Sequence, residues 1–460
     1  MNMLLGFFFG LFLVYTWFYV LQWIVSLVMM VYRLSQSAQR KKLVQWAVPQ
    51  ELARKHPVSV IIAAYNEEAC VTDTIDSLLR EDYPDLEIIL VDDGSRDGMA
   101  RRVLEYFELK RCSPEATQAL GAGAYACYSR EYSDRRLIFL QKENGGKASA
   151  LNCGLKLSTG RYCLVLDADT QVERGAIRIM VSRFLADKRT VVCAGAVGNH
   201  PGVPEGLSFL RKCLIRFQTL EYYRTFYMQR VLLDSVNANL VVSGAFALFD
   251  RELLLSIGGY QENTVGEDME LSMRIHAFCQ SQHRAYRIAY DPDARCTTQL
   301  PMRYRDFFQQ RRRWQIGMIQ SLRRHDYMLI NWHYGWAGML AGIIFLAYEL
   351  YAPFVELLGL LTLATAGFLG ILEVKAVIRI MLVFYLLIVL MEYTLIHALH
   401  SYQAEKIPLG KRLAFLLTAC AECVSFHLIQ SYVKVAAMLT FRKHGKTWKH
   451  INRAREVATK

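Results

Sequence analysis

Hydrophobic and polar positions divide the chain into a charged, alternating middle and two apolar ends. Residues 3–31 carry no charge over 29 positions, which is long enough to cross a bilayer as a helix. A cleaved signal peptide would have a shorter apolar core and a charged start. Arg33, Arg40, Lys41 and Lys42 follow this stretch. Because basic residues concentrate on the cytoplasmic side, we expect the N-terminus outside and the following residues in the cytosol.

From residue 57 to about residue 300, short apolar strands alternate with amphipathic helices. The expected strands are residues 58–64, 86–91, 137–140 and 162–166, and the expected helices are residues 72–80 and 146–157. This alternation predicts an α/β domain with a mostly parallel sheet and helices on both faces. Residues 111–134 interrupt the rhythm with Gly121, Gly123 and polar flanks, and we interpret them as a surface loop or insertion.

The pattern changes again after residue 303. Arginines and aromatic residues interleave over residues 303–333, as in amphipathic helices at a membrane surface. Apolar stretches follow near residues 335–350, 354–372, 377–399 and 413–439. Pro353 is expected to mark a turn between the first two, so that four spans return the basic tail to the cytosol. Residues 401–412 fit less well, because their lysines would face outward, and a re-entrant or interfacial segment is the alternative.

Composition agrees with a soluble domain joined to membrane spans, because the 460 residues are 53% hydrophobic and 21% charged. The net charge is +12, and the basic residues near the spans and at the C-terminus favour contacts with anionic membrane lipids. Nucleic acid is the poorer partner, because no nucleic-acid motif accompanies the charge. Cys420 and Cys423 have CxxC spacing inside an apolar helix without a second pair. We interpret them as small helix-packing residues in preference to a metal or redox site.

Candidate chemistry centres on Asp167-Ala168-Asp169, which closes the strand at residues 162–166. Ligands of open α/β sheets bind outside the carboxyl ends of the strands. Strand alternation points the two carboxylates to one side, with small Ala168 between them. Such hard oxygen ligands suit Mg²⁺ or Mn²⁺ carrying a diphosphate. The alternative is a helix cap or a turn, which is the more common use of Asp-x-Asp after a strand.

Two other strands end in polar loops at the same expected edge of the sheet. Tyr65, Asn66 and Glu67 follow the first strand, and Asp92-Asp93-Gly94 follows the second. An acidic side chain there can accept a hydrogen bond from the imide N–H of a pyrimidine base. The alternatives are a helix cap for Asn66-Glu67 and a tight turn for Asp92-Asp93-Gly94.

Residues 144–149 open the next helix with Asn144-Gly145-Gly146-Lys147. The glycines let backbone approach a ligand, and the helix N-terminus together with Lys147 favours an anion such as diphosphate. The spacing of a Walker motif is absent.

Two further motifs lie on helices. Glu267 and Asp268 begin one helix, where a carboxylate can accept a proton from a sugar hydroxyl, although an acidic first turn is also ordinary helix chemistry. On the basic amphipathic helix, Trp314 can stack on a sugar face and Arg313 can pair with diphosphate. The alternative for this segment is anchoring at the membrane surface.

In this order and combination, the motifs resemble the membrane-integrated glycosyltransferases of family 2, the group of bacterial cellulose, hyaluronan, chitin and poly-N-acetylglucosamine synthases. The resemblance covers roughly residues 57–325 by motif. It implies a GT-A-like doubly wound mixed α/β sheet plus α-helical transmembrane spans. The implied segments are a first span at 1–32, a basic linker at 33–56, a cytosolic transferase domain at 57–302, interfacial helices at 303–333, about four spans at 334–440 and a basic tail at 441–460.

The resemblance also implies roles for single residues. Donor binding falls to Tyr65, Glu67, Asp93, Lys147, Asp167 and Arg313, with Asp93 on the uridine. Acceptor binding falls to Gln310, Trp314, Ser243 and Gly244. Asp169, supported by Asp167, would hold Mg²⁺ or Mn²⁺, and Asp268 beside Glu267 would be the general base. One departure is Ala63-Ala64 before Tyr65, where many relatives have proline.

The implied reaction is a single in-line displacement that inverts the anomeric carbon of a UDP-sugar. The product would be a growing polysaccharide extruded through the protein's own spans in the inner membrane, with a secretion partner or a second copy of the chain as further partners. A single-sugar transferase acting on a membrane lipid is the main alternative. A transport or scaffold protein with a degenerate domain would have lost the carboxylates, which are all present.

Glutamates also fall inside the apolar C-terminal stretches, where a carboxylate is costly and usually faces a bundle interior or a water-filled path. We expect Glu349 and Glu356 at span ends near Pro353, in contact with head groups. Glu422 lies deeper in its stretch and shares a helix face with Gln430, eight positions on. We hypothesise that Glu422 and Gln430 line a polar route for the polymer.

Overall fold

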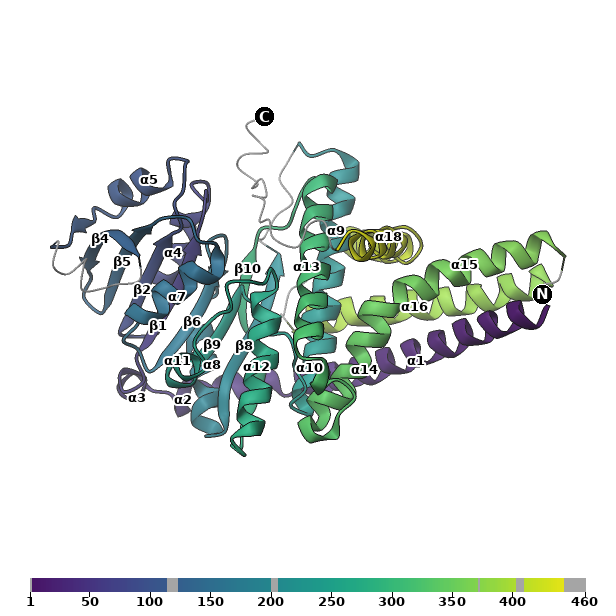
Figure 1. The fold of residues 1–460 in the computed structure, drawn as a ribbon, viewed down its shortest axis with the longest axis horizontal. Coiled ribbons are helices and arrows are strands. Elements are labelled where there is room, and N and C mark those ends of the chain that lie inside the picture. The colour runs from purple at the N-terminus through teal and green to yellow at the C-terminus, as the bar shows by residue number, and fades with distance from the viewer. Residues whose placement is uncertain (1, 114–122, 200–205, 371–372, 403–408, 442–460) are drawn as a thin grey trace.

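The computed structural model describes residues 2–113, 123–199, 206–370, 373–402 and 409–441. An α/β domain occupies one end of the molecule, and a bundle of long helices that includes the N-terminus projects from the other (Figure 1). Between the two lie α9 (Phe209–Tyr223), α12 (Glu267–Ser281) and α13 (Tyr304–Arg324). This arrangement confirms the predicted fold class of a mixed α/β domain joined to apolar helices.

The domain is built on one ten-stranded sheet with the order β3-β4-β5-β2-β1-β6-β9-β8-β10-β7. Its parallel core comprises β5 (Arg135–Lys142), β2 (Leu86–Asp92), β1 (Val58–Ala64) and β6 (Tyr162–Asp167). The antiparallel strand β9 (Phe246–Asp250) joins this core to the parallel pair β8 (Thr190–Asn199) and β10 (Arg287–Thr298). Because β1, β2 and β6 are parallel and paired in register, their carboxyl ends meet at one edge.

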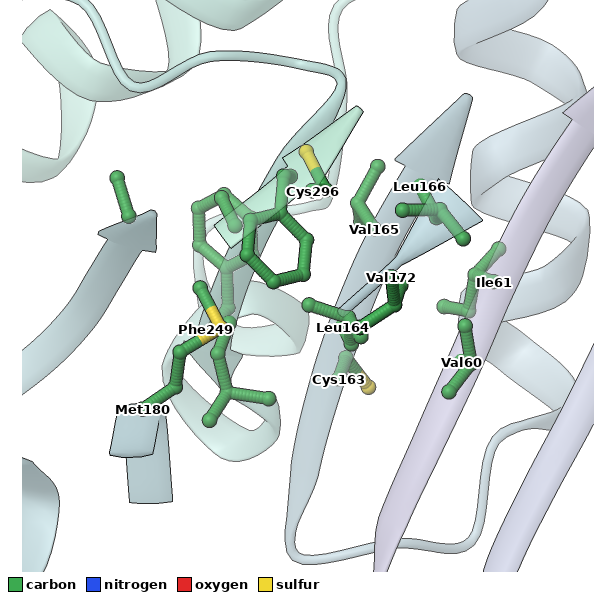
Figure 2. Packing of buried hydrophobic residues seen from close by; sticks show 14 of the residues in the cluster. Val60, Ile61, Cys163, Leu164, Val165, Leu166, Val172, Met180, Phe249 and Cys296 are labelled. Carbon is green, nitrogen blue, oxygen red and sulfur yellow. The ribbon is translucent and has the colours of Figure 1, made fainter. Parts of the chain in front are cut away.

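Continuous apolar runs explain the central strands, because a strand covered on both faces is apolar at every position. Every residue of β1 is buried, and Figure 2 shows Val60 and Ile61 packed beside Leu164 and Leu166 of β6. The helix α7 (Lys147–Leu157) packs on β1 at Gly154. A Cβ there would lie 2.5 Å from Cγ2 of Ile61, so only glycine lets the helix approach this closely.

The predicted loop at residues 111–134 is partly wrong. The strands β3 (Lys110–Arg111) and β4 (Ala124–Glu131) form an antiparallel extension of the sheet beyond β5. Backbone pairing with the edge of β5 stabilises β4, which sequence composition alone could not indicate. Residues 114–122 lie outside the described part of the chain.

The predicted turn at Pro353 is also wrong. The chain is helical without a break from Ala337 to Phe368, through η4 (Ala337–Ala341), α14 (Gly342–Ile344), η5 (Phe345–Tyr351) and α15 (Ala352–Phe368). Pro353 lies in the first turn of α15, directly after a π-helical segment. A first-turn proline tolerates its missing N–H, and the wider π turn leaves room for the ring.

Four helices in the described residues are long and apolar enough to cross a membrane, so three follow the α/β domain instead of the four expected. They comprise residues 10–35 of α1 (Asn2–Ser35), the run Ala337–Phe368, residues 377–402 of α16 (Val374–Tyr402), and the run through α17 (Leu409–Ala421), η6 (Glu422–Phe426) and α18 (His427–Leu439). The first three run side by side, whereas α18 is seen end-on in Figure 1 and packs against α13. The last apolar helix therefore lies across the other three.

Candidate active site

The carboxyl ends of β1 and β6 open onto a cavity of about 840 Å³ that continues between the apolar helices. Asp167 and Asp169 line it at the end of β6, as the sequence predicted. The hydroxyl of Thr74 donates to the carbonyl of Ala168 at 2.8 Å, which fixes the turn that carries both carboxylates. The side chain of Asp167 is 34% exposed, whereas Asp169 is buried. The pair thus presents one open and one recessed carboxylate to the cavity.

Lys147 joins two of the predicted motifs through its ammonium group. Its Nζ lies 2.6 Å from Oδ1 of Asp167 and 3.2 Å from Oε1 of Glu267. Burial alone would lower the pKa of Lys147, but the charges of Asp167 and Glu267 outweigh burial and raise it. Lys147 is therefore a fixed cation at the N-terminus of α7, where an anionic ligand is also favoured by the helix.

Asp268 lies beside this cluster on the first turn of α12. Its Oδ2 accepts a hydrogen bond from the backbone N–H of Gly244 at 3.3 Å, and Oδ1 accepts one from Met269 at 2.7 Å. Burial and the neighbouring charge of Glu267 raise the pKa of Asp268, and Lys147 opposes them. A carboxylate with a raised pKa is a better proton acceptor, so the environment suits the predicted base.

Gly244 has little space around it, because a Cβ there would lie 3.3 Å from both Cβ of Asp268 and Nζ of Lys147. Backbone contact is even closer between α12 and α13. A Cβ on Gly266 would lie 2.7 Å from the main chain of Gly317, and a Cβ on Gly317 would lie 2.6 Å from that of Gly266. The helix that carries Asp268 therefore touches the helix that carries Trp314 through a pair of glycines.

Asp93, which is predicted to contact the uridine, binds the glycine loop before α7 in this structure. Its carboxylate accepts hydrogen bonds from the backbone N–H groups of Gly145 at 2.9 Å and Gly146 at 2.7 Å, and from Nζ of Lys142 at 2.7 Å. Asp93 is buried and is not part of the cavity wall, so in this structure it holds the glycine loop in place. The sequence analysis missed Lys142, although a lysine that ends an apolar strand next to such a loop was a usable signal.

The remaining predicted donor residues are on the cavity wall. Tyr65 and Glu67 line it from the loop after β1. Asn66 adopts a left-handed conformation with φ of 57°, and its Oδ1 accepts from the backbone N–H of Arg96 at 2.8 Å. That turn holds the loop against the segment after β2.

The basic helix α13 contributes Gln310, Arg313 and Trp314 to the cavity wall. Arg311, which the sequence analysis gave no role, stacks over the Trp314 ring at 4.3 Å and forms an ion pair with Glu221 of α9 at 2.5 Å. The cation–π contact and the ion pair hold the indole at the cavity. Surface anchoring alone therefore does not describe this segment.

The cavity continues past Trp314 into the apolar helices, where polar groups occur in pairs. Glu349 accepts from Nζ of Lys434 at 2.8 Å. Glu356 contacts Nε2 of His427 at 2.9 Å and accepts from Tyr15 at 2.9 Å. All of these side chains line the cavity, so the expectation that Glu349 and Glu356 sit at span ends is wrong, because the helix continues through Pro353.

Gln430 lines this part of the cavity as hypothesised, but Glu422 does not. Glu422 is buried, and both of its carboxylate oxygens accept from Arg224 of the π-helix η1 (Arg224–Gln229), at 2.6 and 3.1 Å. Glu392 of α16 accepts from the same guanidinium. The hypothesis failed because the partner of Glu422 is 198 positions away in the sequence.

A divalent metal fits the donor end of the cavity only together with a ligand. In the described residues, no group of three His, Cys, Asp or Glu side chains is close enough to hold a metal ion alone. Asp167 and Asp169 supply two hard oxygen donors, and the other ligands would come from water and a diphosphate. The exposed carboxylate of Asp167 also forms an ion pair with Lys147, and this ion pair would have to loosen for a metal ion to bind.

Comparison with known proteins agrees with this geometry. The chain matches the models of glycosyl transferase family 2 over residues 59–258 and of glycosyl transferase family group 2 over residues 162–429. The protein is thus a glycosyltransferase of family group 2, which confirms the predicted family and enzyme class.

Among its relatives is a poly-beta-1,6-N-acetyl-D-glucosamine synthase of Staphylococcus epidermidis, 28% identical over 70% of this chain and 68% of the relative. A synthase of the same name from Staphylococcus aureus strain COL is 30% identical over 58% of this chain and 56% of the relative. Among solved structures, a mannosyltransferase from Pyrobaculum calidifontis in complex with GDP-Man and Mn²⁺ shares the fold, with 20% identity and a TM-score of 0.50 over 87% of this chain and 99% of that one.

Proposed function

We propose that the protein transfers a sugar from a UDP-sugar to a growing polysaccharide and extrudes the product between its own apolar helices. The observation that carries the proposal is the single cavity that joins the donor-end carboxylates, Trp314 and the polar pairs between the helices. A polymer held there would have its acceptor end at Asp268 and its length between the apolar helices. The similarity to poly-N-acetylglucosamine synthases makes UDP-N-acetylglucosamine the first donor to test.

In the proposed reaction, the acceptor hydroxyl attacks the anomeric carbon while the bond from that carbon to the diphosphate oxygen breaks, which inverts the configuration. The hydroxyl proton passes to Asp268, whose raised pKa suits this role. Lys147 and Arg313 stabilise the negative charge on the leaving UDP. A Mg²⁺ or Mn²⁺ ion held by Asp167 and Asp169 would supply further positive charge there.

The proposed membrane arrangement places three helices across the bilayer, namely α1, Ala337–Phe368 and α16. The helix that ends at Leu439 would lie along the membrane surface beside α13. Three crossings from an outside N-terminus put the catalytic domain and the basic tail on the same, cytosolic side. The tail therefore satisfies the preference of basic residues for the cytosol with two spans fewer than expected.

Polar pairs in the membrane part of the cavity favour a polysaccharide over a lipid acceptor. A lipid tail would have to pack against Glu349, Glu356 and Lys434, whereas sugar hydroxyls can hydrogen-bond to such groups. Product size separates the two acceptors. The purified full chain in detergent is given a panel of UDP-sugars, and UDP release and product length are measured, with Asp268→Asn as the inactive control. A ladder of long products supports the synthase, and single-sugar glycolipid as the only product refutes it.

A further inference from the structure

The cavity wall contains several cations that no sequence motif indicated, and Arg230 is one of them. Arg230 begins α10 (Arg230–Ser235), directly after η1. Its guanidinium donates a hydrogen bond to the carbonyl of Val241, and both residues line the cavity. π-Helical turns are frequent at functional sites, because the wider turn changes the direction in which the next side chains point.

Among the described residues, Arg230 has no carboxylate partner, which it shares with Arg313 and which separates it from three other cations of the cavity wall. Arg224 is paired with Glu392 and Glu422, Arg311 with Glu221, and Lys434 with Glu349. In the part of the chain that the structure describes, Arg230 forms no ion pair at all. Burial lowers its pKa, but a guanidinium remains charged in proteins, so its donors need acceptor atoms.

The position of Arg230 is on the acceptor side of the site. Val241, which it contacts, precedes Ser243 and Gly244 by two and three positions, and the N–H of Gly244 donates to Asp268. The carboxylates whose charges act on Arg230 are those of Asp268 and of Glu349 in the apolar helices. Arg230 therefore contacts the segment that leads to Ser243 and Gly244, which carries the predicted acceptor-binding residues.

We propose that Arg230 binds the terminal sugar of the acceptor chain through a neutral oxygen, namely the acetamido carbonyl of an N-acetylated amino sugar. The assignment rests on the proposed polysaccharide synthase function. Arginine offers donors only, so its ligand must accept, and an amide carbonyl is the strongest neutral acceptor on such a sugar. Val241 accepts from one nitrogen of the guanidinium, and Arg230 is on the cavity wall, so its other donors are available to a ligand there. Arg230 thus sets the affinity for acceptor without taking part in proton transfer.

The test compares Arg230→Gln with the wild type, using the full chain and soluble oligosaccharide acceptors. Glutamine keeps a donor for the Val241 carbonyl but removes the charge and the second direction of donation. We expect the KM for an N-acetylglucosamine oligomer to rise about tenfold, the equivalent of one good hydrogen bond to a charged group. The KM for the UDP-sugar and the rate of its hydrolysis by water should stay unchanged, because neither requires an acceptor sugar.

Two comparisons sharpen the result. The de-N-acetylated oligomer of the same length should bind wild type and Arg230→Gln equally weakly, because the carbonyl is missing. Arg230→Lys should recover part of the acceptor affinity. Arg287→Gln is the matched control, because Arg287 also contacts α10, at Asp234, but is not on the cavity wall.

An unchanged acceptor KM in Arg230→Gln would overturn the proposal, as would equal losses in donor KM and hydrolysis. Thermal unfolding in detergent identifies any variant that merely loses stability, and Arg230→Lys then decides the question. If the wild type extends oligosaccharides while Arg230→Gln does so with normal KM, only the Arg230 assignment fails. If the wild type extends no oligosaccharide and glycosylates lipid, the proposed function itself fails.

Discussion

The two halves of the cavity use charge in opposite ways. At the donor half, Lys147 contacts Asp167 and Glu267, and Asp169 and Asp268 add two further carboxylates, so negative charge is in excess. In the membrane half, Glu349 and Glu356 each have a cationic or hydroxyl partner, and Glu392 and Glu422 share Arg224. The first half is thus suited to attract a metal with its diphosphate, and the second to surround a neutral polymer without holding it tightly. Both halves contain polar groups, so the balance of charge is what distinguishes the reaction site from the path proposed for the polymer.

The largest effect should come from the base in the donor half. Asp268→Asn removes the proton acceptor and keeps the size of the side chain and one of its two backbone hydrogen bonds, so we expect transfer to fall about 10²- to 10⁴-fold. Donor binding, measured by UDP-sugar titration, should stay near the wild-type value. Turnover close to wild type would show that another group accepts the proton.

In the membrane half, breaking a pair should cost stability before it costs chemistry. Arg224→Met leaves Glu392 and Glu422 buried without their common cation, which we expect to destabilise the protein by about 3–5 kcal/mol. Thermal unfolding in detergent measures the loss. Adding Glu392→Gln and Glu422→Gln should restore most of it, and failure of that rescue would mean that the charges are not the cause.

Removing the metal tests whether the excess negative charge of the donor half serves to bind a metal ion together with the diphosphate. With Mg²⁺ or Mn²⁺ chelated, UDP should bind the wild type at least about tenfold more weakly, a change of 1.4 kcal/mol. Asp169→Asn should bind UDP weakly in either condition. If UDP bound the wild type equally well in excess chelator, the carboxylates of the donor half would not bind UDP through a metal ion.

A smaller effect is a shift in pH dependence. The raised pKa of Asp268 puts the acid limb of the kcat–pH profile above the usual range of an aspartate, because the base must be ionised. Glu267 contributes to that increase, so Glu267→Gln should lower the pKa of Asp268 and move the acid limb to lower pH. If the acid limb moved to higher pH instead, the charge of Glu267 would not be raising the pKa of Asp268.

The smallest effect concerns access to the membrane half. After the native cysteines are removed, a cysteine replacing Gln430 should react with a water-soluble thiol reagent and become protected when polymer is trapped. The replacement Glu422→Cys should stay unreactive, because Glu422 is 2% exposed. Equal labelling at both positions would place the path elsewhere.

The two halves of the cavity also differ in how much of each could be predicted from the sequence. Donor residues such as Asp167, Asp169 and Lys147 occupy strand ends or helix starts, so short-range patterns identified them and parallel topology brought them together. The membrane half depends on contacts such as Arg224 with Glu392, which no local pattern connects. Pro353 shows the same limit, because a π-helical turn before it removed the break that the residue type predicts.

The contact between Gly266 and Gly317 has a consequence for how this enzyme can vary. Because main-chain atoms of the two helices touch there, backbone thickness alone sets the spacing between the base-bearing and tryptophan-bearing helices. Side chains elsewhere on α12 and α13 can change without altering that spacing. A related enzyme that uses a different sugar must therefore differ elsewhere in the cavity wall. Side-chain substitutions elsewhere on α12 and α13 do not change the distance between Asp268 and Trp314.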